Sequence, residues 1–182
     1  RTPDHTAIAL TAAAIDFHRR EKKSFWWEHY SRRENPIDEW ENDKDVYIVE
    51  KCEVVSDWAV PASTRAKLKR RTIKLHTKPG PGSKVSVGDA RWLLYPAEAE
   101  SLPSDDNPGY LRVVERATVK EVEGDSILFI EESLPADVEP YDYVPVALVP
   151  GRPIGTENLE AAIKQWGEKV LAEYPNLTPD PA

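Results

Sequence analysis

The first third of the chain carries a helical pattern of apolar positions. Residues 4–23 are rich in alanine and contain neither glycine nor proline. Apolar residues recur there at the three- and four-residue spacing of one helix face: Ile8, Ala12 and Ile15. A second, short helix is predicted over residues 24–33, with Ser24 as its cap and Asn35-Pro36 as its end.

From residue 45 the period of the pattern changes from helical spacing to alternation. Val, Ile, Thr and Tyr become frequent, and Gly- or Pro-containing turns separate the segments. Six strand regions are predicted: 45–58, 71–77, 84–95, 110–122, 126–132 and 143–149. The clearest hairpin turns at Glu123-Gly124-Asp125. Short strands in this arrangement favour a small antiparallel β-barrel of about six strands.

Strand alternation also predicts which side chains face the barrel interior. Ile73 and Leu75 share one parity, whereas Leu68 has the other, so a bend or bulge is expected near residues 69–71. The expected core comprises Ile73, Leu75, Val85, Val87, Val119, Ile127 and Phe129.

An amphipathic helix is predicted near the C-terminus. Thr156 is a favourable N-cap, and Tyr174-Pro175 ends the segment. Its apolar stripe consists of Leu159, Ile163, Trp166 and Val170. The predicted fold is therefore mainly β with helical flanks, an α+β chain. Its expected parts are a helical segment (1–43), a barrel (44–150), a C-terminal helix (151–174) and a linker stub (175–182).

Composition narrows the class of protein. The chain has 182 residues, 40% of them apolar, and a formal net charge of -8. No apolar run approaches the roughly 20 residues of a membrane helix, and the single Cys52 excludes a disulfide framework. We therefore expect a cytoplasmic protein without a membrane partner. Arg1 in first position and the absence of methionine lead us to expect a piece of a longer protein.

Charge is distributed unevenly along the chain. Residues 65–95 hold 9 basic and 1 acidic residues, whereas residues 96–150 hold 3 basic and 13 acidic ones. Two interpretations stay open: the basic block forms a phosphate-binding patch, or it pairs with acidic strands across the sheet. The candidate nucleic-acid-binding residues of this block are Arg65, Lys67, Lys69, Arg70, Arg71, Lys74 and Lys78.

A second basic group surrounds aromatic residues in the N-terminal helical segment. Its cations are Arg19, Arg20, Lys22, Lys23, Arg32 and Arg33, and its aromatic residues are Phe25, Trp26, Trp27 and Tyr30. Cations interleaved with aromatic rings stack and hold nucleic-acid bases. Aromatic residues at this spacing also pack a helix onto a neighbouring element, which is the second interpretation. Of these cations we retain Arg19 and Arg20 as candidate nucleic-acid contacts.

The sequence contains no convincing catalytic or metal-binding pattern. The four histidines and one cysteine lack the short spacings of a zinc site. Glu21-Lys22-Lys23 matches the E-x-K of metal-dependent nucleases, but it lies at a predicted helix end, where residues two apart diverge. The segment around Gly80-Pro81-Gly82 precedes a strand and lacks the Gly-Lys-Ser/Thr of a phosphate-binding loop. We therefore assign this chain no catalytic residue, metal or cofactor.

The order of segments resembles a family of large bacterial proteins. The block Phe17-His-Arg-Arg-Glu-Lys-Lys-Ser-Phe-Trp-Trp27 is similar to a "YHRREKPAWW"-like block in proteins that join a RecB-like nuclease to a superfamily 1 DNA/RNA helicase. The basic strand, Val87-Gly88-Asp89, the hairpin over 116–132 and the helix over 159–171 follow in the family's order. The sequence departs from the family after Asp89 and carries an acidic loop at 96–108.

The resemblance implies a setting and a function for the predicted barrel. In related superfamily 1 helicases a small β-barrel beside the first motor domain guides the nucleic-acid strand. The chain is then expected to be a non-catalytic accessory domain that contacts single-stranded or forked nucleic acid. Its other partners would be the helicase motor and the nuclease of the same chain, which alone would require ATP and a divalent metal. The alternative is a structural spacer or protein-interaction module with no nucleic-acid binding of its own.

Overall fold

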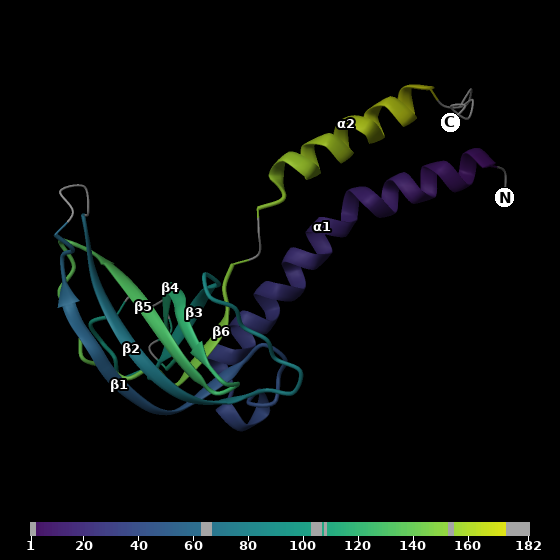
Figure 1. Cartoon of the computed structure of the whole chain (residues 1–182). Helices are drawn as coiled ribbons and strands as arrows, with labels where there is room; N and C mark the ends of the chain where they lie inside the picture. The colour runs from purple at the N-terminus through teal and green to yellow at the C-terminus, as the bar shows by residue number, and fades with distance from the viewer. Residues whose placement is uncertain (1–2, 63–66, 103–106, 108, 153–154, 174–182) are drawn as a thin grey trace. The chain divides into compact units, whose positions relative to one another are not determined.

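A computed structural model shows a six-stranded barrel and a pair of helices (Figure 1). It describes residues 3–62, 67–102, 107, 109–152 and 155–173. The elements, in chain order, are α1 (Pro3–Glu34), the 3₁₀ turn η1 (Ile37–Glu39), β1 (Tyr47–Ala59), β2 (Leu68–Pro79), β3 (Ala90–Tyr95), β4 (Arg112–Glu123), β5 (Ile127–Pro135), β6 (Ala147–Pro150) and α2 (Glu157–Glu173). The predicted linker stub at 175–182 lies outside the described residues.

The chain divides into two compact units. The barrel unit runs from Tyr30 to Arg152 and includes the last turn of α1. The helical unit combines residues 1–29 with residues 153–182, and therefore contains most of α1 and all of α2.

All strand pairs in the barrel unit are antiparallel, in the order β1-β2-β5-β4-β3-β6, and β6 pairs with β1 to close the ring. The closure is short: among the described residues β1 and β6 pair through Tyr47 with Leu148 and Ile48 with Ala147, and the amide of Val49 donates to the carbonyl of Val146 just before β6. The mainly-β fold with helical flanks, predicted from alternation and turn spacing, is confirmed.

The barrel core consists of inward-pointing residues from all six strands, together with Ala99, Leu102 and Tyr141 from the connecting segments. Ile73 and Leu75 of β2 are fully buried, as predicted, and so is Val119 of β4. The β5 prediction had the wrong parity: Leu128 and Ile130 are fully buried, whereas Ile127 and Phe129 are only half-buried. The register explains the difference, because Ile130 lies opposite Ile73, and directly opposed residues share a face of the sheet.

Two further expectations about the strands were wrong. Val87 is 65% exposed, because β3 begins only at Ala90, after a loop in which Gly88 takes a φ of 94°. β2 pairs with β5 without interruption from Leu68 to His76, so β2 has no bulge there. The irregularity opposite Arg70 and Thr72 lies instead in β1, which has extra residues between Ser56 and Ala59, between Val54 and Ser56 and between Val49 and Lys51. The pairing of β4 with β3 and with β5 also shifts register once each.

The last turn of α1 is held to the barrel unit by two arginines. Arg32 forms an ion pair with Asp43, with 3.0 Å between Nη2 and Oδ2. Arg33 Nε donates a hydrogen bond to the carbonyl of Leu111 at 3.0 Å, and the amide of Leu111 donates to the carbonyl of Arg33. Arg32 and Arg33 are both buried, and both contribute to the structure through these contacts.

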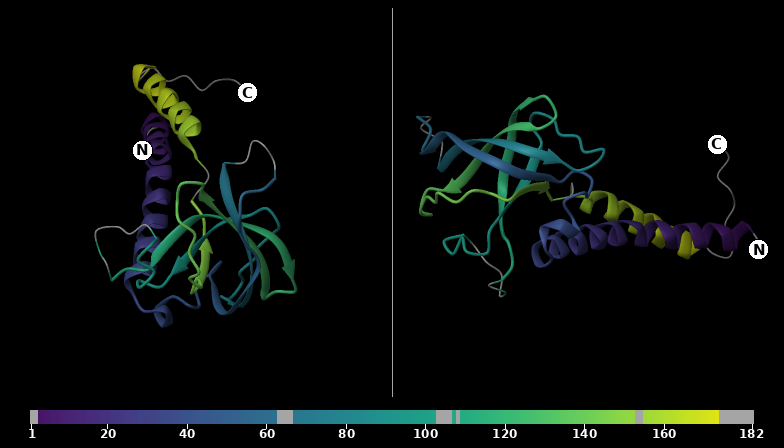
Figure 2. Two further views of the ribbon diagram at one scale, coloured as in Figure 1. Left: turned by 90° about the vertical axis from the view of Figure 1, so that its left-hand side faces the viewer. Right: turned by 90° about the horizontal axis from the view of Figure 1, so that it is seen from below.

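In the helical unit, α1 and α2 lie side by side and antiparallel (Figure 2). Gly167 of α2 faces Thr11 and Ile15 of α1, and Lys22 of α1 forms an ion pair with Glu160 of α2 at 2.6 Å. Residues 4–23 and 24–33 form one continuous helix, because no glycine or proline interrupts them. None of the described helices is both long and apolar enough to cross a membrane.

Candidate nucleic-acid interface

The basic strand predicted from the sequence is β2, and several of its cations have carboxylate partners on neighbouring segments. Arg70 pairs with Glu131 of β5 at 3.2 Å, and Lys74 pairs with Glu123 of β4, also at 3.2 Å. Lys78 pairs with Glu41 at 3.3 Å. Glu131 also pairs with Lys120, at 3.0 Å. These pairs correspond to the second interpretation of the charge pattern, in which acidic segments neutralise the basic strand.

The remaining candidates near β2 have different environments. Lys67 is exposed, whereas Lys69 donates a hydrogen bond from Nζ to the carbonyl of Val138 at 2.9 Å. Arg65 lies outside the described residues. Arg71, a predicted nucleic-acid contact, points into the barrel and is only 2% exposed, so it is not available to a phosphate.

Arg71 lies at the centre of a buried polar cluster. Its Nε and Nη2 donate to Oε2 of Glu132 at 2.8 and 2.6 Å, and its Nη1 donates to the carbonyl of Tyr141 at 3.0 Å. The other carboxylate oxygen of Glu132 accepts hydrogen bonds from the hydroxyls of Tyr95 and Tyr141. The guanidinium also lies 4.9 Å from the ring centroids of Trp58 and Tyr141.

The environment of this cluster keeps its phenols neutral. Burial, reinforced by the negative charge of Glu132, raises the pKa of Tyr95 well above its ordinary value and also raises the pKa of Tyr141. Each carboxylate oxygen of Glu132 has a donor, and Glu132 is fully buried. The cluster therefore has the properties of a structural core element, in which Arg71 of β2 and Glu132 of β5 are direct cross-strand partners.

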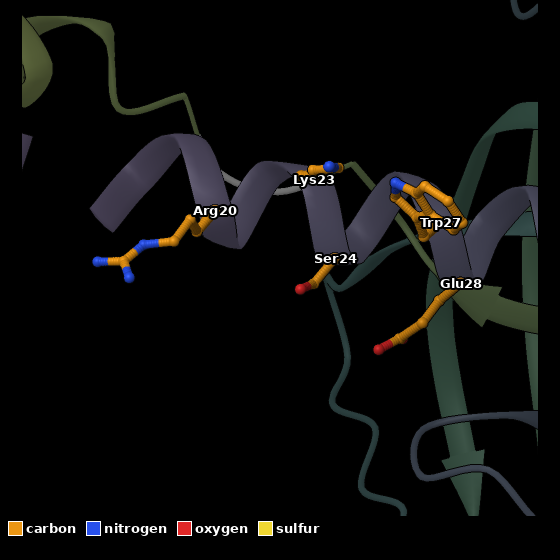
Figure 3. Close-up of a pocket in the computed structure, with 5 residues that line it drawn as sticks. All are labelled: Arg20, Lys23, Ser24, Trp27 and Glu28. Carbon is orange, nitrogen blue, oxygen red and sulfur yellow. The ribbon is translucent and has the colours of Figure 1, made fainter. Parts of the chain in front are cut away.

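The second predicted group, on α1, provides a more accessible surface. Trp27 is 68% exposed, and Nζ of Lys23 lies 5.7 Å from its ring centroid. Both side chains line a shallow hollow of about 590 Å³ together with Arg20, Ser24 and Glu28, as Figure 3 shows. Within the described part of the chain Lys23 forms no ion pair. We refer to these five residues as the α1 surface.

The other aromatic residues of the group pack against one another. Phe25 and Trp26 meet edge-to-face with ring centroids 5.5 Å apart, and Trp26 meets His29 in the same way at 5.8 Å. Phe25 and Trp26 are half-buried and His29 is buried. Trp26 is thus packed against other aromatic rings, whereas Trp27 is mostly exposed. The sequence alone does not distinguish these two neighbouring tryptophans.

The structure describes the two candidate α1 cations, Arg20 and Arg19, to different extents. Arg20 is exposed on the α1 surface, where its Nη2 lies 3.4 Å from the carbonyl of Ala13. The side chain of Arg19 lies outside the described residues. No three His, Cys, Asp or Glu side chains among the described residues are grouped so that they would hold a metal ion.

A second hollow, of about 470 Å³, lies at one end of the barrel. It is bounded by residues 79–86 and by the turn between β4 and β5, and its charged lining residues are Lys84 and Asp125. Burial raises the pKa of Tyr47, which also lines it. One cation and one carboxylate give this hollow no preference for an anionic ligand.

Comparison with known proteins does not assign this chain to a family. No family model, no curated protein and no solved structure matches it.

Proposed function

We propose that this chain is a non-catalytic accessory β-barrel domain of a nuclease–helicase and that it contacts single-stranded or forked nucleic acid. The resemblance of residues 17–27 to the nuclease–helicase block supports this setting. The observation that carries the contact is the exposed indole of Trp27 with Lys23 and Arg20 on the same helix surface. ATP and a divalent metal would act in the motor and nuclease of the parent protein, which are the other partners of this domain.

The α1 surface has the two kinds of group that single-stranded nucleic acid requires. Ammonium and guanidinium groups attract phosphates and release counterions, so each contact makes binding dependent on salt. An exposed indole offers a flat apolar face to a base. Because only two described cations line the hollow and the net charge is -8, the affinity is expected to be modest.

The second candidate function is a structural spacer or protein-interaction module. The observation that favours it is the neutralisation of β2, where Arg70, Lys74 and Lys78 each have a carboxylate partner. A barrel whose basic strand is paired in this way retains little charge with which to attract a polyanion.

A salt titration distinguishes the two functions. Fluorescence anisotropy would measure binding of a labelled single-stranded 20-mer, a fork and a duplex to the wild-type chain from low to physiological salt. If two phosphates are engaged, the logarithm of the binding constant falls with the logarithm of salt concentration with a slope of about -1.4. We expect Arg20→Gln/Lys23→Gln to abolish this binding.

The matched control for charge is Arg70→Gln/Lys74→Gln, which removes the same two charges from β2. We expect this variant to retain most of the binding, because Arg70 and Lys74 already have carboxylate partners in the wild-type chain. Absence of binding by the wild-type chain at low salt would establish the spacer interpretation. If the β2 variant alone loses binding, the nucleic-acid interface lies on the barrel and not on α1.

A further inference from the structure

We infer that Trp27 holds one unpaired base flat against its indole, so that the α1 surface selects single strands over duplex. This inference rests on the proposed function and specifies the form of nucleic acid that the surface accepts. It follows from the position of one side chain relative to the cations around it.

The first step of the argument is that most of the Trp27 side chain is not covered by the described part of the chain. It is 68% exposed, whereas its neighbour Trp26 contacts both Phe25 and His29. A large indole left in water loses the free energy that burial would provide. Its exposure therefore makes it available to an external partner.

The second step concerns the chemistry next to the ring. Lys23 Nζ lies over the indole at 5.7 Å from the centroid, and Arg20 lies one further turn toward the N-terminus on the same hollow. Cations beside an exposed ring match a ligand that has a flat π face and a negative charge close to it. A nucleotide combines both features, whereas an apolar peptide would offer no negative charge to the ammonium of Lys23.

The third step concerns the selection of single strands. In a duplex every base is stacked on its neighbours, so its π face is hidden, and extruding a base costs a few kcal/mol. In a single strand the bases are accessible, and an aromatic side chain accepts any of them with little sequence preference. Contacts to phosphate alone would not make this distinction, because both forms carry phosphates.

Three variants test the role of the indole. Trp27→Leu removes the aromatic face, Trp27→Phe keeps a smaller one, and Trp166→Leu is the matched control. Trp166 is also an exposed tryptophan, 49% accessible, but among the described residues no cation lies over its ring. Anisotropy titrations at one low salt concentration would use a single-stranded 12-mer, a duplex and the same 12-mer with abasic sites.

The expected results separate stacking from charge. We expect the wild-type chain to bind the 12-mer more tightly than the duplex or the abasic 12-mer. Trp27→Leu should weaken binding of the 12-mer by about 5- to 150-fold and leave the salt slope unchanged, because stacking of one base is worth about 1–3 kcal/mol. Trp27→Phe should lose less, and Trp166→Leu should bind as the wild type does. Unchanged helical circular dichroism would show that the variants remain folded.

The outcomes also separate this inference from the proposed function. If the wild-type chain binds the 12-mer and Trp27→Leu binds equally well, the stacking inference is wrong and the proposed function stands. The same conclusion follows if duplex binds as tightly as single strand. If no nucleic acid binds at low salt, both the inference and the proposed function are wrong.

Discussion

Arg70 and Arg71 are adjacent in the chain and have opposite environments. Arg70 points outward and meets Glu131 at the surface, whereas Arg71 points into the barrel and meets the buried Glu132. Alternation along β2 separates them, because successive side chains of a strand lie on opposite faces. The pair therefore provides a direct comparison of a surface ion pair with a buried one.

Replacement of these two arginines should have unequal effects on stability. Arg71→Met leaves the carboxylate of Glu132 buried without its cation, and loss of one partner of a buried pair costs about 3–5 kcal/mol. Arg70→Met breaks an exposed pair, which is worth at most about 1 kcal/mol. Urea denaturation of the two variants measures the difference. Equal losses of stability would show that Glu132 finds compensation elsewhere.

At the scale of strands and helices, the sequence predicted where strands and helices occur, but it did not predict which side chains of β5 face the interior. Alternation located the strand regions, but the inward parity of β5 is set by its pairing with β2, where Ile130 lies opposite Ile73. Cross-strand register is a long-range property, and a local pattern of Ile127, Leu128, Phe129 and Ile130 is apolar at both parities. The interruptions of β1 pairing were missed for the same reason.

The candidate interface illustrates the same limit of sequence-based prediction. Both basic groups are visible in the sequence, and β2 has the denser one. Its partners are distant along the chain: Glu123 lies 49 residues from Lys74, and Glu41 lies 37 residues from Lys78. Local composition does not show which cations are neutralised in this way. It also does not show that Trp27 is exposed while Trp26 is packed.

Helices α1 and α2 approach each other closely at Gly167. A Cβ atom at this position would lie 2.7 Å from Cδ1 of Ile15 and 3.3 Å from Cγ2 of Thr11. Gly167→Leu should therefore separate the two helices at a cost of about 1–3 kcal/mol, as overpacking does elsewhere. Lys164→Leu, on an exposed position of α2, is the control and should have little effect.

A second substitution tests whether this contact is responsible. Ile15→Ala creates space opposite position 167, so the double variant Ile15→Ala/Gly167→Leu should recover part of the lost stability. Thermal unfolding followed by helical circular dichroism would measure all four variants. If Ile15→Ala and Gly167→Leu destabilise additively, the helices do not meet at this point.

At the scale of the whole molecule, the two units are stabilised to different extents. In the barrel unit, a continuous core of buried apolar residues is enclosed by a closed ring of strands. In the described part of the helical unit, the buried residues along the α1–α2 contact are Thr11, Gly167 and Val170. The candidate interface lies on α1 in this helical unit, whereas the neutralised basic strand belongs to the barrel. The proposed contact thus depends on the unit with the smaller core.

This difference predicts separate levels of protection from hydrogen exchange. A two-helix contact with few buried residues opens at a lower free energy than a closed barrel, because isolated helices are marginally stable in water. Amides of α2 and of α1 before Trp27 should therefore exchange faster than those of β2 and β5, as mass spectrometry of peptic fragments would measure. The last turn of α1 should exchange slowly, because Arg32 and Arg33 hold it to Asp43 and Leu111 of the barrel unit. A binding oligonucleotide should slow exchange around Trp27 and leave β2 unchanged. Equal protection of both units would instead show that helices and barrel unfold as one cooperative structure.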